Sequence, residues 1–191
     1  MIRARRTSRA VPALAPGTSS VGAAVTVTIP STTPLNTYYL LACADYANVV
    51  TEVDEGNNCL ASASPIQVAR PDLVETAVSD PPAAAAPGGT FTVTDTVQNQ
   101  GGLAASASTT RYYLSTDAQR GAGDILLTAS RAVPGLAPGA SSPGAPVTVT
   151  IPSATPASAY YVLACADDTK VVTEASESNC RASATAVTVS R

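Results

Sequence analysis

Residues 90–98 read Thr-Phe-Thr-Val-Thr-Asp-Thr-Val-Gln, in which threonine, or glutamine at the end, occupies every second position without a break. A period of two is typical of a β-strand, because successive side chains point to opposite faces of the sheet. The alternation places Phe91, Val93, Asp95 and Val97 on one face. The cluster Asn-Gln-Gly-Gly that follows at 99–102 indicates a turn. The stretch therefore predicts a strand that faces a core with one side.

Six further segments near this stretch combine β-branched residues with flanking glycine, proline and asparagine, as strands do. They are residues 72–78, 108–115, 125–133, 146–151, 159–167 and 181–190. No segment has helical periodicity. About seven short strands in roughly 120 residues predict an all-β fold, an immunoglobulin-like antiparallel β-sandwich.

An internal repeat organises the chain. Residues 9–17 (RAVPALAPG) recur at 131–139 (RAVPGLAPG), and residues 25–30 (VTVTIP) recur unchanged at 147–152, an offset of 122. We therefore expect residues 71–191 to form one complete β-sandwich. Residues 1–70 are expected to be the C-terminal part of a truncated second copy, a half-sandwich, with Met1 at the edge of a fragment.

A half-sandwich leaves its inward face without opposing strands. We expect that face to consist of Val25, Val27, Ile29, Tyr39 and Leu41. Each Å² of apolar surface left in water forfeits about 25 cal/mol. The segment is therefore expected to be less ordered, or to pair with something that this chain does not contain. The alternative is a short protein whose first 70 residues dock as an extra layer.

The four cysteines fall as one pair in each copy, Cys43 with Cys59 and Cys165 with Cys180. Both members of a pair lie next to consecutive predicted strands, so an antiparallel hairpin would bring them opposite each other. This arrangement favours one disulfide within each copy, which would imply an oxidising compartment. Free structural thiols and a metal site remain alternatives, although a zinc site would lack both a C-x-x-C motif and histidine.

The loops between the paired cysteines are the most acidic parts of the chain. The carboxylates are Asp45, Glu52, Asp54 and Glu55 in the first copy, and Asp167, Asp168, Glu174 and Glu177 in the second. Oxygen ligands gathered in one loop suit calcium. The spacing is not that of an EF-hand, and acidic turn residues commonly bind their own backbone. The loops are thus either calcium sites or solvated turns, and no other cofactor is expected.

Composition and charge exclude several function classes. The sequence has no histidine, which removes Ser-His-Asp and Cys-His nucleophile pairs. Four arginines among the first nine residues account for much of the basic charge. Removing these four cations from the total of −3 leaves −7 for residues 10–191. We therefore expect no nucleic-acid partner. No apolar run has the length of a membrane helix, and no apolar region follows the arginines, so neither a membrane span nor an export signal is expected.

Several motifs in order resemble those of the CARDB family, the cell adhesion related domain found in bacteria. They are Pro71-Asp72-Leu73, Val97-Gln98-Asn99-Gln100-Gly101, Tyr112-Tyr113-Leu114-Ser115-Thr116-Asp117, Gly123-Asp124-Ile125-Leu126-Leu127, Leu136-Ala137-Pro138-Gly139-Ala140-Ser141, and the closing strand Tyr161 to Asp167 followed by Glu174. The resemblance covers essentially all of residues 71–191, and its second half again covers residues 9–69.

The resemblance implies a β-sandwich module that occurs in tandem on bacterial cell-surface or secreted proteins and acts in adhesion or as a spacer. It implies no catalytic residues, so we expect a non-catalytic, extracellular or cell-surface module. Neighbouring copies of the same domain, or a surface protein or glycan ligand, are the expected partners. The alternative is a calcium- or carbohydrate-binding accessory module of a secreted hydrolase.

Overall fold

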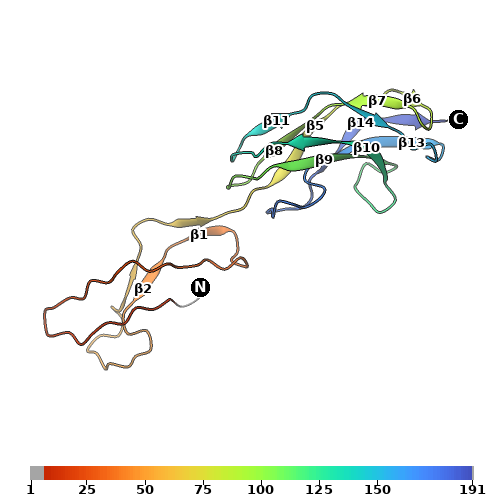
Figure 1. The fold of residues 1–191 in the computed structure, drawn as a ribbon. Helices are drawn as coiled ribbons and strands as arrows, with labels where there is room; N and C mark the ends of the chain where they lie inside the picture. The colour runs from red at the N-terminus through yellow and green to blue at the C-terminus, as the bar shows by residue number, and fades with distance from the viewer. Residues whose placement is uncertain (1–6, 191) are drawn as a thin grey trace. The chain divides into compact units, whose positions relative to one another are not determined.

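The computed structural model of the chain describes residues 7–190, and all of its regular elements are β-strands (Figure 1). The chain divides into two compact units, unit 1 (Met1–Val68) and unit 2 (Ala69–Arg191). Unit 1 contains β1 (Asn36–Tyr38), β2 (Leu41–Cys43), β3 (Cys59–Ala61) and β4 (Ile66–Val68). Unit 2 contains β5 (Leu73–Val78), β6 (Ala84–Ala85), β7 (Thr90–Val93), β8 (Asp95–Asn99), β9 (Ser108–Ser115), β10 (Ile125–Val133), β11 (Ser141–Pro143), β12 (Val147–Thr150), β13 (Ser158–Cys165) and β14 (Cys180–Val189).

Unit 2 is an immunoglobulin-like β-sandwich, as the sequence predicts. One layer is the five-stranded sheet β10-β9-β13-β14-β6, and the other combines the sheet β11-β8-β5 with the pair β12-β7. Neighbouring strands are antiparallel except for the short parallel pair of β6 and β14. The two layers are visible face to face in Figure 1.

The main core of unit 2 lies between these layers. Strands of both layers contribute fully buried residues, including Val93, Tyr112, Leu114, Val149, Val162 and Val187. The predicted alternation at residues 90–98 is confirmed, since Phe91, Val93, Asp95 and Val97 are all buried. Asp95 is thus a carboxylate inside an otherwise apolar face.

Two local features differ from the predicted strands. The strand expected at 90–98 is divided at Thr94, whose amide donates to Ser79 Oγ and whose carbonyl accepts from the Ser79 amide. This division lets β7 pair with β12 while β8 pairs with β5 and β11. The short strands β6 and β11 were not predicted, because each is only two or three residues long and lacks alternation.

Unit 1 consists of two short hairpin-like pairs, β1 with β4 and β2 with β3, and extended segments without regular structure. The expected inward positions of Tyr39 and Leu41 are wrong on the evidence of unit 2. Their counterparts there, Tyr161 and Leu163, lie outside the main core, Tyr161 half-buried and Leu163 in a separate cluster with Tyr113 and Cys165, whereas Tyr160 and Val162 belong to the main core. The core-facing tyrosine of unit 1 is therefore Tyr38.

Candidate functional site

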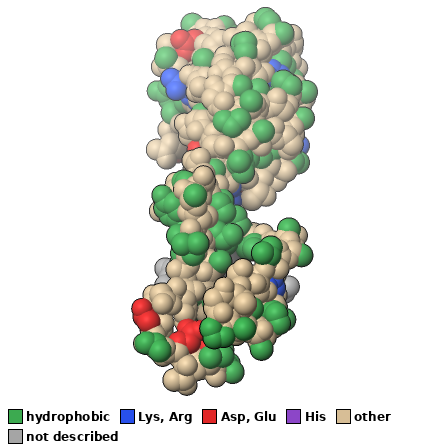
Figure 2. Space-filling model, turned by 90° about the vertical axis from the view of Figure 1, so that its left-hand side faces the viewer, with side chains coloured by type: hydrophobic (Ala, Val, Ile, Leu, Met, Phe, Trp, Pro, Cys, Tyr) green, Lys and Arg blue, Asp and Glu red, His purple; other side chains and the backbone are tan. Residues whose placement is uncertain are grey.

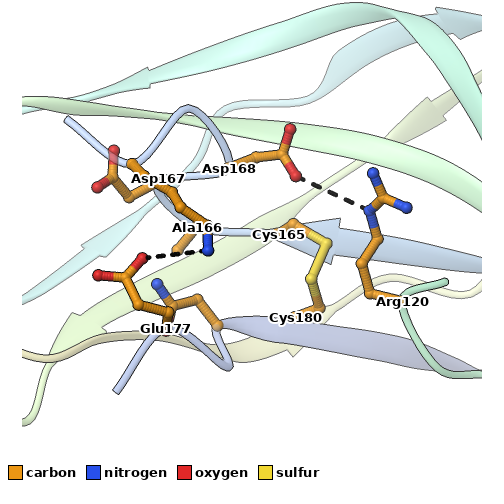
Figure 3. A pocket seen from close by; sticks show the side chains of 9 residues that line it. Arg120, Cys165, Ala166, Asp167, Asp168, Glu177 and Cys180 are labelled. Atoms are coloured by element: carbon orange, nitrogen blue, oxygen red, sulfur yellow. Dashed lines mark ion pairs between the residues drawn. A yellow bond between two sulfur atoms is a disulfide. The ribbon is translucent and has the colours of Figure 1, made fainter. Parts of the chain in front are cut away.

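A hollow of about 300 Å³ lies over the disulfide that joins β13 to β14 (Figure 3). Cys165 and Cys180 are direct partners in the register of the two strands, and their Cα atoms are 4.0 Å apart. The other residues that line the hollow are Arg120, Ala166, Asp167, Asp168, Lys170, Glu177 and Asn179. This is where the acidic loop of the second copy meets the loop between β9 and β10.

Asp168 is the carboxylate of the hollow that contacts the most charged and polar side chains. It accepts a hydrogen bond from the Tyr113 hydroxyl at 2.7 Å and lies 3.6 Å from Arg111 and 3.8 Å from Arg120. Burial and this bond to Asp168 raise the pKa of Tyr113. The Arg120 guanidinium also lies 3.8 Å from the centre of the Tyr113 ring, in cation–π geometry. The charge of Asp168 is therefore already balanced by side chains of unit 2.

Glu177 stands at the opposite side of the hollow and faces Lys170, with Nζ and Oε2 3.8 Å apart (Figure 3). Both side chains are well exposed, and exposed pairs contribute at most about 1 kcal/mol. The Glu177 carboxylate also accepts a hydrogen bond from the Glu174 amide at 3.4 Å. Glu177 is therefore the most accessible carboxylate of this loop.

Asp167 closes the turn that follows β13. Its backbone is left-handed, with φ 43°, and its carboxylate accepts from the amides of Val171 and Val172 at 3.2 and 2.8 Å. Asp45 repeats this arrangement in unit 1, with φ 35° and bonds from the amides four and five residues later. Both aspartates are thus used to build turns, in the way that aspartate commonly does.

Glu174 points away from the hollow and ties the acidic loop to the first strand of unit 2. Its Oε2 accepts from the Leu73 amide at 2.7 Å and from Asn179 Nδ2 at 3.1 Å. Burial raises the pKa of Glu174 to about 7, and the bond from Leu73 opposes that rise. Glu174 is therefore a structural carboxylate that joins two parts of the sandwich.

In unit 1, the remaining predicted carboxylates are engaged within their own loop or exposed. Asp54 accepts from the Gly56 amide at 2.8 Å, and Glu55 accepts from the Glu52 amide at 2.9 Å. Across residues 7–190, no three acidic or cysteine side chains gather in a way that could hold a metal ion. The structure thus brings Asp167, Asp168 and Glu177 around one hollow but turns Glu174 elsewhere.

A buried polar cluster between the layers of unit 2 was not predicted as such. The single Arg131 Nε–H is shared between both Asp95 oxygens at 2.9 Å, a terminal guanidinium nitrogen of Arg131 also donates to Asp95, and the Tyr112 hydroxyl donates to it at 2.7 Å. Glu75 lies beside this pair and accepts from Thr110 Oγ1 at 2.9 Å. Asp95 in the inward face of its strand, and the arginine that begins the repeated motif at 131, were the signals present in the sequence.

Both disulfides of the expected pairing are present, Cys43–Cys59 and Cys165–Cys180. We predict that replacing Cys165 and Cys180 together by alanine lowers the free energy of unfolding of unit 2 by about 3 kcal/mol. The reason is that the bond restricts a loop of about 15 residues in the unfolded chain. Urea denaturation followed by tyrosine fluorescence measures this change.

The matched control is the chain with Cys43 and Cys59 replaced by alanine, which should leave the unfolding of unit 2 unchanged. Adding a reductant to the unsubstituted chain gives a second measurement without any change of side-chain volume. Equal stability of unit 2 with and without its disulfide would contradict the prediction.

Comparisons with known proteins give one family and several solved structures. The CARDB family model matches residues 3–62 and 70–184. A CARDB domain from Pyrococcus furiosus, whose crystal structure is in complex with di-metal ions, is 21% identical, with a TM-score of 0.42, covering 63% of this chain and 90% of that chain. A domain assigned to a cell surface protein from Methanosarcina acetivorans is 20% identical, with a TM-score of 0.43, covering 64% of this chain and 94% of that chain. No curated protein matches.

No helix within the described residues has the length and apolar composition that a membrane crossing requires.

Proposed function

The chain belongs to the CARDB family, and from this premise we propose that it is a non-catalytic extracellular module that serves in adhesion or as a spacer in a bacterial cell-surface or secreted protein. The observation that carries the proposal is the family match over both units, residues 3–62 and 70–184. A module of this kind works through its shape and its attachment points. Its partners would be neighbouring copies of the domain and a surface protein or glycan.

The disulfides support the extracellular part of the proposal. Each unit holds one cystine, and no cysteine of the described residues is free. Disulfides persist in oxidising environments and are rare in the reducing cytosol. A chain that uses all its cysteines in this way is suited to the outside of the cell.

The chemistry of the hollow supports a structural role for its charges. Asp168 is held by a tyrosine and two arginines, and Asp167 is committed to its own turn. An acid–base pair of carboxyls would need two groups that can exchange protons with a substrate, and of the three carboxyls at the hollow only Glu177 is left accessible. The sequence also offers no histidine for such work.

The location can be tested on intact cells of the producing organism. If the protein is held at the cell surface, we expect a protease that cannot cross the envelope to destroy the epitopes of unit 2 in intact cells. If it is secreted, we expect these epitopes to be detected in the medium. Beads coated with the full chain should then attach to cells or matrix more than beads coated with the reduced and alkylated chain. Epitopes that remain protected until lysis, with cysteines that react as free thiols, would overturn the extracellular proposal.

The hollow also gives a specific reason to test the alternative, a calcium- or carbohydrate-binding accessory module. Its exposed carboxylate, Glu177, faces a space lined by Asp168 and Asn179. Because Asp168 and Asp167 are already engaged, we predict that calcium titrated into the full chain gives no binding heat and no change in Tm. Isothermal calorimetry and a melting curve measure both quantities.

A stoichiometric heat of calcium binding that disappears in Glu177→Gln would contradict this prediction and favour the accessory module. Glu55→Gln is the matched control, because Glu55 occupies the corresponding place in unit 1. Magnesium at the same ionic strength separates a specific site from general screening of an acidic surface.

A further inference from the structure

Unit 1 repeats the local structure of the second half of unit 2 contact by contact. The Tyr38 hydroxyl donates to the Pro34 carbonyl at 2.9 Å, and the Tyr160 hydroxyl donates to the Pro156 carbonyl at 3.1 Å. The disulfides and the aspartate turns described above correspond in the same way, and Gly17 and Gly139 share a φ of 76°. The fold of this half is therefore set up locally, without the strands that cover it in unit 2.

The apolar side chains of unit 1 that correspond to the core of unit 2 are uncovered. Their exposed fractions lie between 39% and 58%, whereas those of their counterparts are 6% or less. We call this set the open face of unit 1: Val11, Leu14, Val27, Ile29, Leu40, Val50 and Ile66, which correspond to Val133, Leu136, Val149, Ile151, Val162, Val172 and Val187. Figure 2 shows green apolar side chains gathered on the surface of unit 1, in the lower part of the view. In unit 2, strands β5 to β9 supply the covering side chains.

Arg9 of unit 1 makes the same contacts with its neighbouring serine as its counterpart Arg131 makes in unit 2. Arg9 donates to the side chain and the carbonyl of Ser20 at 2.9 and 3.1 Å, and Arg131 donates to the same atoms of Ser142 at 3.2 and 3.3 Å. A Cβ atom on Gly22 would collide with the Arg9 side chain, so the arginine lies flat against a glycine. In unit 2, a Cβ atom on Gly144 would likewise collide with the Arg131 side chain. Arg131 has Asp95 as its partner, but no carboxylate among residues 7–190 pairs with Arg9.

A second charged group of unit 1 also lacks the partner that its counterpart has in unit 2. Glu52 corresponds to Glu174. The backbone amide of each donates a hydrogen bond to the side chain of the glutamate three residues later. Glu174 receives the Leu73 amide of the first strand at 2.7 Å, whereas the Glu52 carboxylate has no hydrogen-bond partner among the described residues. Arg9, held by Ser20, and the unpaired carboxylate of Glu52 thus lie at positions where the first half of a domain would meet them.

We propose that the open face of unit 1 is a docking surface for the first half of a CARDB domain, a set of strands with the chemistry of residues 71–116 and a carboxylate at the position of Asp95. That carboxylate binds Arg9, and the amide that begins the first strand binds Glu52. The first half within unit 2 cannot serve, because Asp95 and Leu73 are already bound there. The proposal goes beyond adhesion and does not depend on the proposed function.

The contacts of unit 2 argue against self-association of the open face as its natural cover. Two copies meeting through this face could bring Arg9 of one copy to Glu52 of the other, but neither copy supplies the strand amide that Glu174 receives in unit 2 or the side chains with which β5 to β9 cover the corresponding set. A first half-domain satisfies both groups and covers the apolar set in the same step.

A chain in which residues 69–130 are placed directly ahead of Arg9 tests the proposal. The junction Ser130-Arg9 copies the natural junction Ser130-Arg131, so the added strands can reach the open face in the register of unit 2. Amide exchange in residues 36–68 is expected to slow at least 100-fold, and unit 1 is expected to gain a cooperative unfolding transition. The control is the same chain with Asp95→Asn in the added segment only, and it should lose most of the gain.

A peptide of residues 90–99 tests the recognition chemistry on the unmodified full chain. In unit 2 these residues pair with 141–143 and 147–150, so the peptide should bind beside residues 19–28 of unit 1. We expect the Arg9 Nε–H resonance and those of residues 19–28 to shift, with unit 2 unchanged. Binding should weaken at least tenfold for the peptide with Asp95→Asn or for the chain with Arg9→Gln.

Three results would overturn the proposal: no added protection in the extended chain, equal binding of the aspartate and asparagine peptides, or a dimer formed through the open face in sedimentation experiments. None of them depends on where the protein is located or what it adheres to. Failure here is therefore distinct from failure of the proposed function.

Discussion

Replacing Arg131 by methionine is expected to lower the free energy of unfolding of unit 2 by about 3–5 kcal/mol, the usual cost of removing one partner of a buried ion pair. Arg131 and Asp95 are only 8% and 3% exposed, and Arg131 Nε bonds both Asp95 oxygens at 2.9 Å. Without the guanidinium, the Asp95 charge would remain buried with the Tyr112 hydroxyl as its main partner. Urea denaturation monitored by circular dichroism measures the loss.

Two controls separate the charge effect from packing. Adding Asp95→Asn to Arg131→Met should restore part of the lost stability, because the uncompensated charge is then gone. Arg9→Met should change stability by no more than about 0.5 kcal/mol, since Arg9 is exposed and has no carboxylate partner among residues 7–190. A double variant that loses the sum of both single effects would show that the two residues do not act as a pair.

The strands could be predicted from the sequence because their signals are local. Alternation at residues 90–98 and the β-branched segments give seven predicted segments, which lie close to the observed bounds of eight strands of unit 2, because the segment 90–98 covers both β7 and β8. The break at Thr94 could not be predicted, since it depends on Ser79, which lies in another part of the chain. The parallel contact of β6 with β14 depends on tertiary structure in the same way.

The site was predictable in its residue types but not in its geometry. A cluster of carboxylates in a loop does not reveal whether they accept hydrogen bonds from backbone amides or remain available to bind a metal ion. Asp167 is used in this way, and Glu174 instead reaches Leu73, which is 101 positions away in the sequence. The buried pair of Asp95 and Arg131 was marked by a charged residue at an inward position of a strand. Its partner could be found only when the fold brought β10 against β8.

Raising the pH from 5 to 8 is expected to destabilise unit 2 through Glu75. Burial, and next the negative charge of Asp95, raise the pKa of Glu75 to about 8, while Thr110 and Arg131 oppose the rise. In the unfolded chain this carboxyl has its ordinary pKa of 4.5. Between these two values the folded state holds a proton that the unfolded state has released, so stability falls as the pH rises. Each pH unit in this window costs at most about 1.4 kcal/mol.

The total loss expected between pH 5 and pH 8 is on the order of 2–4 kcal/mol, and stability should change little above the folded pKa. Glu174, with its pKa raised to about 7 by burial, adds a smaller loss in the same direction. Urea midpoints measured at intervals of one pH unit from 5 to 9 record the profile. The other ionisable groups that face Glu75 are Asp95, Arg131 and Tyr112. Burial raises the pKa of Tyr112, and, against the lowering effect of burial, the hydrogen bond to Asp95 raises the pKa of Arg131, so neither of these two groups loses its proton in this range.

Glu75→Gln isolates the contribution of this one proton. Glutamine keeps an oxygen that accepts from Thr110 Oγ1, which donates to Glu75 at 2.9 Å, and it carries no titrating charge. We expect the variant to match the unsubstituted chain near pH 5 and to be the more stable of the two at pH 8–9. The remaining slope should then be reduced further by Glu174→Gln. Parallel pH profiles for the chain with and without Glu75→Gln would mean that Glu75 is already ionised inside the sandwich at pH 5. The cluster would in that case hold two carboxylates against a single arginine, and Arg131→Met would have to cost more than the range expected for one buried pair.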